Sequence, residues 1–155
     1  MFRVWIKRRR ELKRRAESGT AALEFGLTVP FLLLFLMAVV ELGFAMYETM
    51  QVYNSVEAGV LYASKYGFDS AGISAAVVNA TGTQGLTASP VPAQFCGCPQ
   101  TGGVSAVSCG ATCADGSAPG QYARIHAALP RQTVLPYFNL PLPATLTAQA
   151  ITRLN

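Results

Sequence analysis

A long apolar stretch, residues 20–47, constrains the fold of this chain more than any other feature. It follows a run of basic residues between Arg3 and Arg15 and has one carboxylate, Glu24, near its beginning. About 20 apolar residues in a helix suffice to cross a bilayer. A charged group inside hydrocarbon costs about 2.5–3.5 kcal/mol on insertion scales, so Glu24 is a candidate functional residue. The sequence therefore predicts a membrane-spanning helix over residues 20–47.

The distribution of charge predicts how this helix is oriented. Eight of the twelve Lys and Arg residues lie in residues 1–15, whereas the chain after Gly19 has four basic and six acidic residues. Basic residues beside a membrane span mark its cytoplasmic side. We expect a cytoplasmic N-terminus, an extracytoplasmic C-terminal part and contact of the basic run with the lipid bilayer. Nucleic acid is the less favoured partner for this run.

A secretory signal peptide is the alternative interpretation of the apolar stretch. It would need a cleavage site of small residues soon after a short apolar region. The residues around Ala45 offer only a poor site of this kind. A retained single-pass anchor is therefore preferred to a secreted domain released near Ala45.

The membrane helix is predicted to continue as an amphipathic helix over residues 48–67. Its polar face is expected to contain Glu41, Glu48, Gln51 and Ser55. Gly67 is the expected end of the helix, because glycine readily adopts the backbone conformation that terminates helices. Pro30 lies inside the helix and is expected to loosen it, since proline removes one backbone hydrogen bond. Three- and four-residue steps define the apolar stripe of this helix, which comprises Leu42, Ala45, Met46, Thr49, Val52, Val56, Val60 and Ala63.

Residues 68–155 are predicted to form a small extracytoplasmic domain rich in β-structure. A short helix is expected over residues 73–79, and strand-like segments over residues 85–91, 122–129 and 145–153. The last two segments alternate apolar and polar residues, so we expect them to pair antiparallel and pack against the long helix. The fold class is therefore α+β. The connection between these two segments is rich in proline, with Pro130, Pro136, Pro141 and Pro143.

Four cysteines lie within one segment rich in Gly, Ser and Thr, and are Cys96, Cys98, Cys109 and Cys113. In an oxidising compartment, four cysteines in a loop with little core indicate two disulfides. Three pairings are possible, and those that join the first two cysteines to the last two are favoured. A structural zinc site is the alternative, although its ligands usually follow a C-x2-4-C spacing that the first two cysteines lack.

The sequence has no pattern typical of an enzyme. His126 is the single histidine, and Asp69 and Asp115 are isolated from other candidate catalytic residues. No phosphate-binding glycine loop, nucleophile motif or pair of catalytic carboxylates appears. We therefore expect no catalytic activity, no metal and no cofactor.

Two motifs resemble a known family. Residues 19–25, Gly-Thr-Ala-Ala-Leu-Glu-Phe, fit a processing pattern of Gly, four residues, Glu and an aromatic residue, and Pro30 follows at the family's position. Residues 41–43, Glu-Leu-Gly, resemble a Glu-x-Gly motif at the end of the span. Residues 56–63 resemble the family's Ala/Gly-rich helix end, without its usual arginines. In these features the chain resembles TadE-like minor pseudopilins of the tight-adherence (Flp, type IVb) pilus machinery.

The resemblance implies a processed assembly subunit of the bacterial inner membrane. A prepilin peptidase would cleave between Gly19 and Thr20, removing residues 1–19. The new amine at Thr20 would then lie near Glu24 carboxylates of neighbouring subunits. The implied partners are other pseudopilins and the major pilin, reached through the N-terminal helix, and the inner-membrane pilus platform. Glu24, Phe25, Pro30 and Glu41 are the implied assembly residues; the alternative is an uncleaved anchor with an extracytoplasmic binding domain.

Overall fold

The computed structural model describes residues 2–131 and 142–154, with side chains from Gly19 onward. The predicted basic run and two of the connecting prolines, Pro136 and Pro141, lie outside the described side chains. The chain divides into two compact units, residues 1–43 and 44–155, and each is described by itself.

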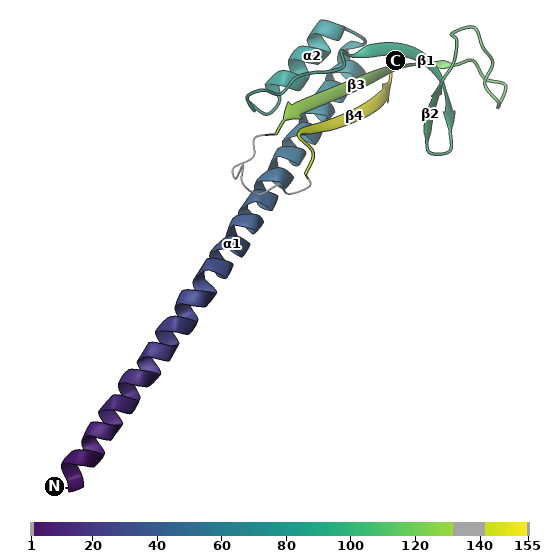
Figure 1. Cartoon of the computed structure of the whole chain (residues 1–155). Coiled ribbons are helices and arrows are strands. Elements are labelled where there is room, and N and C mark those ends of the chain that lie inside the picture. The colour runs from purple at the N-terminus through teal and green to yellow at the C-terminus, as the bar shows by residue number, and fades with distance from the viewer. Residues whose placement is uncertain (1, 132–141, 155) are drawn as a thin grey trace. The chain divides into compact units, whose positions relative to one another are not determined.

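Helix α1 (Phe2–Tyr66) is continuous through Pro30 and contains all of the predicted membrane segment (Figure 1). It begins before the expected residue 20, because Arg, Lys and Glu are good helix formers. It ends where the sequence predicted. Gly67 has a φ of 81°, and its N–H donates a hydrogen bond to the carbonyl of Ala63 at 3.0 Å. This left-handed glycine terminates the helix.

The first unit consists of the N-terminal part of α1, and most of its large apolar side chains between Leu23 and Leu42 are exposed. Phe31 is 69% exposed and Phe35 72%. Thr28 donates its side-chain hydroxyl to the carbonyls of Glu24, at 3.0 Å, and Phe25, at 3.2 Å. The hydroxyl is thus satisfied inside the helix and presents no unpaired polar group to hydrocarbon. The segment Gly19–Tyr66 is long and apolar enough to cross a membrane, and it fits a single-pass membrane anchor.

The second unit is built on an antiparallel sheet with the strand order β2-β1-β3-β4 (Figure 1). The register between β3 and β4 places Ile125 opposite Ala150 and His126 opposite Gln149. This pairing confirms the antiparallel arrangement expected for the two alternating segments. The strands are β1 (Ala93–Gln100), β2 (Gly103–Ala106), β3 (Gly120–Pro130) and β4 (Thr145–Arg153).

The hydrophobic core of this unit lies between the sheet and the helices α1 and α2 (Ser70–Asn79). Gly59 is at the centre of this contact. A Cβ added there would lie 2.7 Å from Val77 Cγ2 and 3.0 Å from Ile125 Cγ2, so glycine allows α1, α2 and β3 to approach closely. The alternation of residues 122–129 predicted one inward face for this strand, and the structure confirms that face. Its buried residues are Ala123, Ile125, Ala127 and Leu129.

The predicted apolar stripe of α1 is buried as expected at Val52, Val56 and Ala63, but other positions on its two predicted faces need correction. Ser55, expected on the polar face, is fully buried, and its hydroxyl donates to the carbonyl of Val52 at 2.7 Å. Glu41, also expected to be exposed, is only 3% exposed. Met46, expected in the apolar stripe that packs, is 58% exposed. The face of α1 that packs against the core carries small side chains, which allow the sheet to approach closely. This packed face is therefore rotated about the helix axis from the face that carries the largest apolar side chains.

Two segments of the second unit also differ from their predicted structure. The segment from Cys96 to about Gly120, expected to be a loop, contains β2 and most of β1. Residues 85–91, expected to be a strand, form only an isolated bridge between Thr87 and Ala128. The difference arises because Pro90 and Pro92 each lack a backbone donor, whereas the segment containing Cys96 pairs on both sides.

Candidate functional site

The predicted processing and assembly residues lie on successive turns of α1. Gly19 and Thr20 are exposed, as are Glu24, Phe25 and Pro30. Phe25 is 71% exposed, and a Cβ on Gly19 would meet nothing within 4 Å. The side chains of this segment are thus presented to the surroundings of the helix, where lipid or other helices can contact them.

Glu24 and Thr20 are one helical turn apart, whereas Glu41 is distant from both. Residues four apart lie on the same face of a helix. Glu41 is 17 positions beyond Glu24 in the same helix, which corresponds to about 26 Å along the axis at 1.5 Å per residue. The structure therefore brings Glu24 and Thr20 together but does not place Glu41 near them.

An ion pair that no sequence pattern predicts joins α1 to the end of β3. Arg131 Nε lies 3.9 Å from Glu48 Oε2, and the two side chains are 4% and 22% exposed. The Arg131 N–H also donates to the carbonyl of Ala144 at 2.9 Å. Arg131 thereby links the segment before β4 to the helix. The signal in the sequence was a charged residue directly after an apolar alternating strand, and only the tertiary structure reveals its partner.

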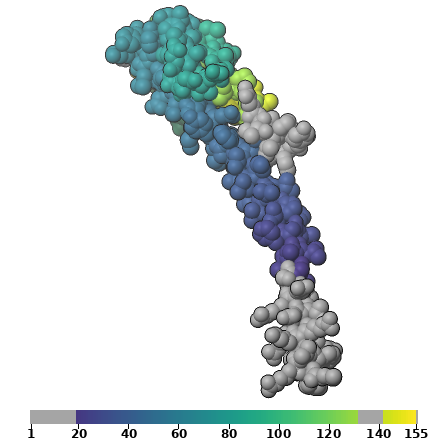
Figure 2. Space-filling view, turned by 90° about the vertical axis from the view of Figure 1, so that its left-hand side faces the viewer, coloured from purple at the N-terminus to yellow at the C-terminus, as the bar shows by residue number. Residues whose placement is uncertain are grey.

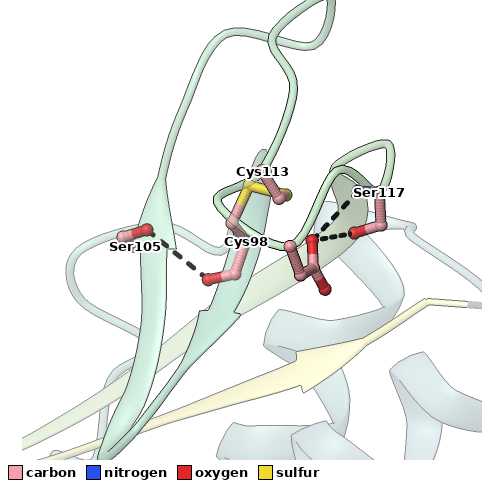
Figure 3. Close-up of a disulfide and its surroundings, with 5 residues drawn as sticks. Cys98, Ser105, Cys113 and Ser117 are labelled. Carbon is pink, nitrogen blue, oxygen red and sulfur yellow. Dashed lines mark hydrogen bonds between the residues drawn. A yellow bond between two sulfur atoms is a disulfide. The ribbon is translucent and has the colours of Figure 1, made fainter.

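The four cysteines form two disulfides, Cys96–Cys109 and Cys98–Cys113, with Cα–Cα distances of 5.1 and 5.6 Å. Both bridges start from β1, and Figure 3 shows the second one. Disulfides, rather than the alternative zinc site, thus account for all four cysteines. This pairing joins the first two cysteines to the last two, as favoured from the sequence.

The loop that the disulfides hold contains a local carboxylate interaction. The hydroxyl and the N–H of Ser117 donate to Asp115 Oδ1 at 2.7 and 3.0 Å. These hydrogen bonds hold the pKa of Asp115 below its usual value, because they favour the charged carboxylate. Asp115 is fully exposed, so this interaction orders the loop but does not make a catalytic environment.

His126 lies on β3 beside a shallow open cavity. Tyr53 of α1 and Thr147, Ala148 and Gln149 of β4 line the cavity together with His126. Besides His126, the lining includes no carboxylate and no second imidazole, so these side chains offer hydrogen bonds only. Among the described residues, no cluster of three or more His, Cys, Asp or Glu side chains could hold a metal ion.

Comparison with known proteins agrees with the resemblance noted in the sequence. A family model described as TadE-like protein matches residues 19–61. The matched segment begins at the predicted processing glycine and covers α1 to within two turns of its end at Tyr66. No curated protein and no solved structure matches the chain. The match over residues 19–61 supports the TadE-like family of the tight-adherence pilus system as the family that this segment resembles.

Proposed function

We propose that this protein is a non-catalytic minor pseudopilin of a tight-adherence (Flp-type) pilus, processed by a prepilin peptidase after Gly19. One observation carries the proposal: the TadE-like match begins at Gly19 and covers an apolar helix. TadE-like proteins associated with pili are generally structural rather than catalytic.

Processing would change the charge at the start of the helix. Cleavage after Gly19 removes the basic leader and creates an amine at Thr20, four residues before Glu24. An α-amino group has a usual pKa of about 7.7–8.0, so it is largely cationic at neutral pH. In a low-dielectric environment, pairing with a neighbour's Glu24 offsets part of the cost of burying each charge. The pair would favour helices that assemble in one register.

The division of the chain supports this role. We assign residues 1–19 as the cytoplasmic leader, 20–47 as the span, 48–67 as its helical extension and 68–155 as a periplasmic domain. The membrane would be the bacterial inner membrane, crossed once. The two disulfides support a periplasmic position for the last segment, because disulfides persist in oxidising compartments. Incorporation into an extracellular pilus would keep the domain in such a compartment.

The proposed partners follow from the exposed helix. Other pseudopilins and the major pilin would contact residues 20–47, whose large apolar side chains are exposed in the single chain. The prepilin peptidase and the inner-membrane platform would act on the same segment before assembly. Phe25 and Pro30 would contribute apolar contacts near the Glu24 pair.

Deletion of this protein from a cell that makes the pilus tests the role. We expect few or no pili by electron microscopy, with restoration when the full-length chain is supplied. The major pilin should still be present in the membrane, which distinguishes an assembly defect from loss of the pilin. Normal pilus number and length without the protein would contradict the proposal and favour an uncleaved anchor with a separate binding function.

A further inference from the structure

The exposed side of α1 in the second unit carries an apolar stripe that includes one charged residue. Its five residues, named here the outer stripe, are Met46, Met50, Tyr53, Glu57 and Leu61. They follow one another at steps of three and four, so they share one face of the helix. Met50 is 64% exposed and Leu61 is 62% exposed. The outer stripe points away from the buried face that contains Val52 and Val56.

The opposite side of the same unit is a sheet face that carries only positive charge. Residues directly opposite in the register project from the same side of the sheet. Tyr122 lies opposite Phe95 and Arg153, and Arg124 lies opposite Ile151. Because the alternate residues of β3 face the core, these side chains project from the other side of the sheet. We name Phe95, Tyr122, Arg124, Ile151 and Arg153 the outer sheet face.

The aromatic residues of the outer sheet face hold one guanidinium in place. Arg124 lies over the Phe95 ring, 4.8 Å from its centroid, and that ring stacks on Tyr122 at 5.8 Å. A guanidinium that stacks on a ring keeps its N–H groups at the rim available for a carboxylate. Arg153, opposite Tyr122, lies diagonal to Arg124 on the neighbouring strand.

Within the described parts of the chain, the charged groups on these two surfaces form no ion pairs. The four strands contain two arginines and no Asp or Glu. Among the residues that the structure describes, neither Arg124 nor Arg153 pairs with a carboxylate, and Glu57 pairs with no cation. Ile151 is 39% exposed beside the two arginines. One side of the unit therefore presents apolar and acidic groups, and the other presents apolar and basic groups.

We propose that the outer stripe of one copy of this protein docks on the outer sheet face of a second copy, with Glu57 pairing with Arg124 and Arg153. A second copy is the proposed partner because the acidic outer stripe and the basic outer sheet face are complementary in charge. Two outer stripes packed on each other as parallel helices would bring Glu57 close to Glu57, and like charges disfavour that contact. The proposal goes beyond the pilus role and does not depend on cleavage after Gly19.

The proposed contact is heterologous, because the two surfaces differ and lie on opposite sides of the unit. Such contacts can repeat from copy to copy.

Charge reversal in the full-length protein tests the contact. We expect Glu57→Arg alone, and Arg153→Glu alone, each to weaken self-association in detergent about tenfold, which corresponds to about 1.4 kcal/mol. Both substituted residues are exposed, so the fold should persist. Analytical ultracentrifugation measures the association, and circular dichroism checks the fold. Asp115→Arg is the matched control, because Asp115 is an exposed acidic residue in the loop after Cys113, outside both surfaces.

Mixing the two variants distinguishes this contact from a symmetric one. An equimolar mixture of Glu57→Arg and Arg153→Glu proteins should associate more strongly than either variant alone, because the unmodified Glu57 of one variant can dock on the unmodified Arg124 and Arg153 of the other. If two outer stripes contacted each other instead, mixing Glu57→Arg with unmodified protein would strengthen the association, and Arg153→Glu would leave it unchanged. The proposal would be overturned by this pattern of a symmetric contact. It would also be overturned if either single variant associated as strongly as the unmodified protein, or if the unmodified protein did not self-associate.

Discussion

Replacing Glu24 with alanine is expected to abolish pilus assembly while the protein still inserts into the membrane. Glu24 is exposed on α1, one turn after Thr20. A helix that only had to cross the membrane would not need a carboxylate at this position. Removing one partner of a buried charge pair costs about 3–5 kcal/mol. That is a factor of more than about a hundred in an assembly equilibrium. Electron microscopy of pili, with immunoblots of membrane fractions, measures the two properties separately.

Conservative variants separate charge from shape at this position. Glu24→Gln retains a hydrogen-bonding side chain of the same size but no charge, so it should assemble poorly. Glu24→Asp keeps the charge and should assemble better than Glu24→Gln. Thr28→Ala, one turn further along, removes only a hydroxyl that is satisfied inside the helix and should leave pilus number unchanged. Normal assembly of Glu24→Ala would refute the role of this carboxylate.

Removing the disulfides is expected to destabilise the second unit strongly. The bridges close segments with sequence separations of 13 and 15 residues. Closing a loop of this length contributes about 3 kcal/mol in the loop-entropy model. The pair substitution Cys96→Ser with Cys109→Ser, and the pair Cys98→Ser with Cys113→Ser, should each lower the free energy of unfolding by about this amount. Urea unfolding of the full-length protein in detergent, followed by circular dichroism, measures the change.

A reducing agent provides the control for this prediction. It should destabilise the unmodified protein and leave the variant with all four cysteines replaced unaffected. Hydrogen exchange should report the loss of protection first in β1, because both bridges start there. An unfolding midpoint that does not change when both bridges are removed would show that strand pairing alone stabilises this part of the sheet.

Local signals in the sequence were sufficient for much of the fold. The alternation in residues 122–129 predicted the inward face of β3, because side chains in a strand point to opposite sides in turn. Gly67 predicted the end of α1, since its positive φ costs little in glycine. The apolar stretch predicted the membrane segment because bilayer thickness fixes the length of a spanning helix.

Features that depend on tertiary contacts were harder to predict. Strand β1 contains Gly97 and Pro99, which disfavour strands, and pairing with β2 and β3 overrides this preference. The burial of Ser55 and Gly59 on α1 depends on close packing, which hydrophobic periodicity does not report. The ion pair of Arg131 with Glu48 joins residues far apart in sequence, so no local pattern reveals it. The motif at residues 19–30 is local, so it could be recognised from the sequence alone, and the family match includes it.

The N-terminus of the membrane-extracted protein tests the central claim most directly. The full-length chain would be produced with and without a cognate prepilin peptidase, and its mass and N-terminal sequence determined. A processed pseudopilin predicts a start at Thr20 only when the peptidase is present. A start at Met1 in both samples would contradict the account and identify the protein as a retained anchor.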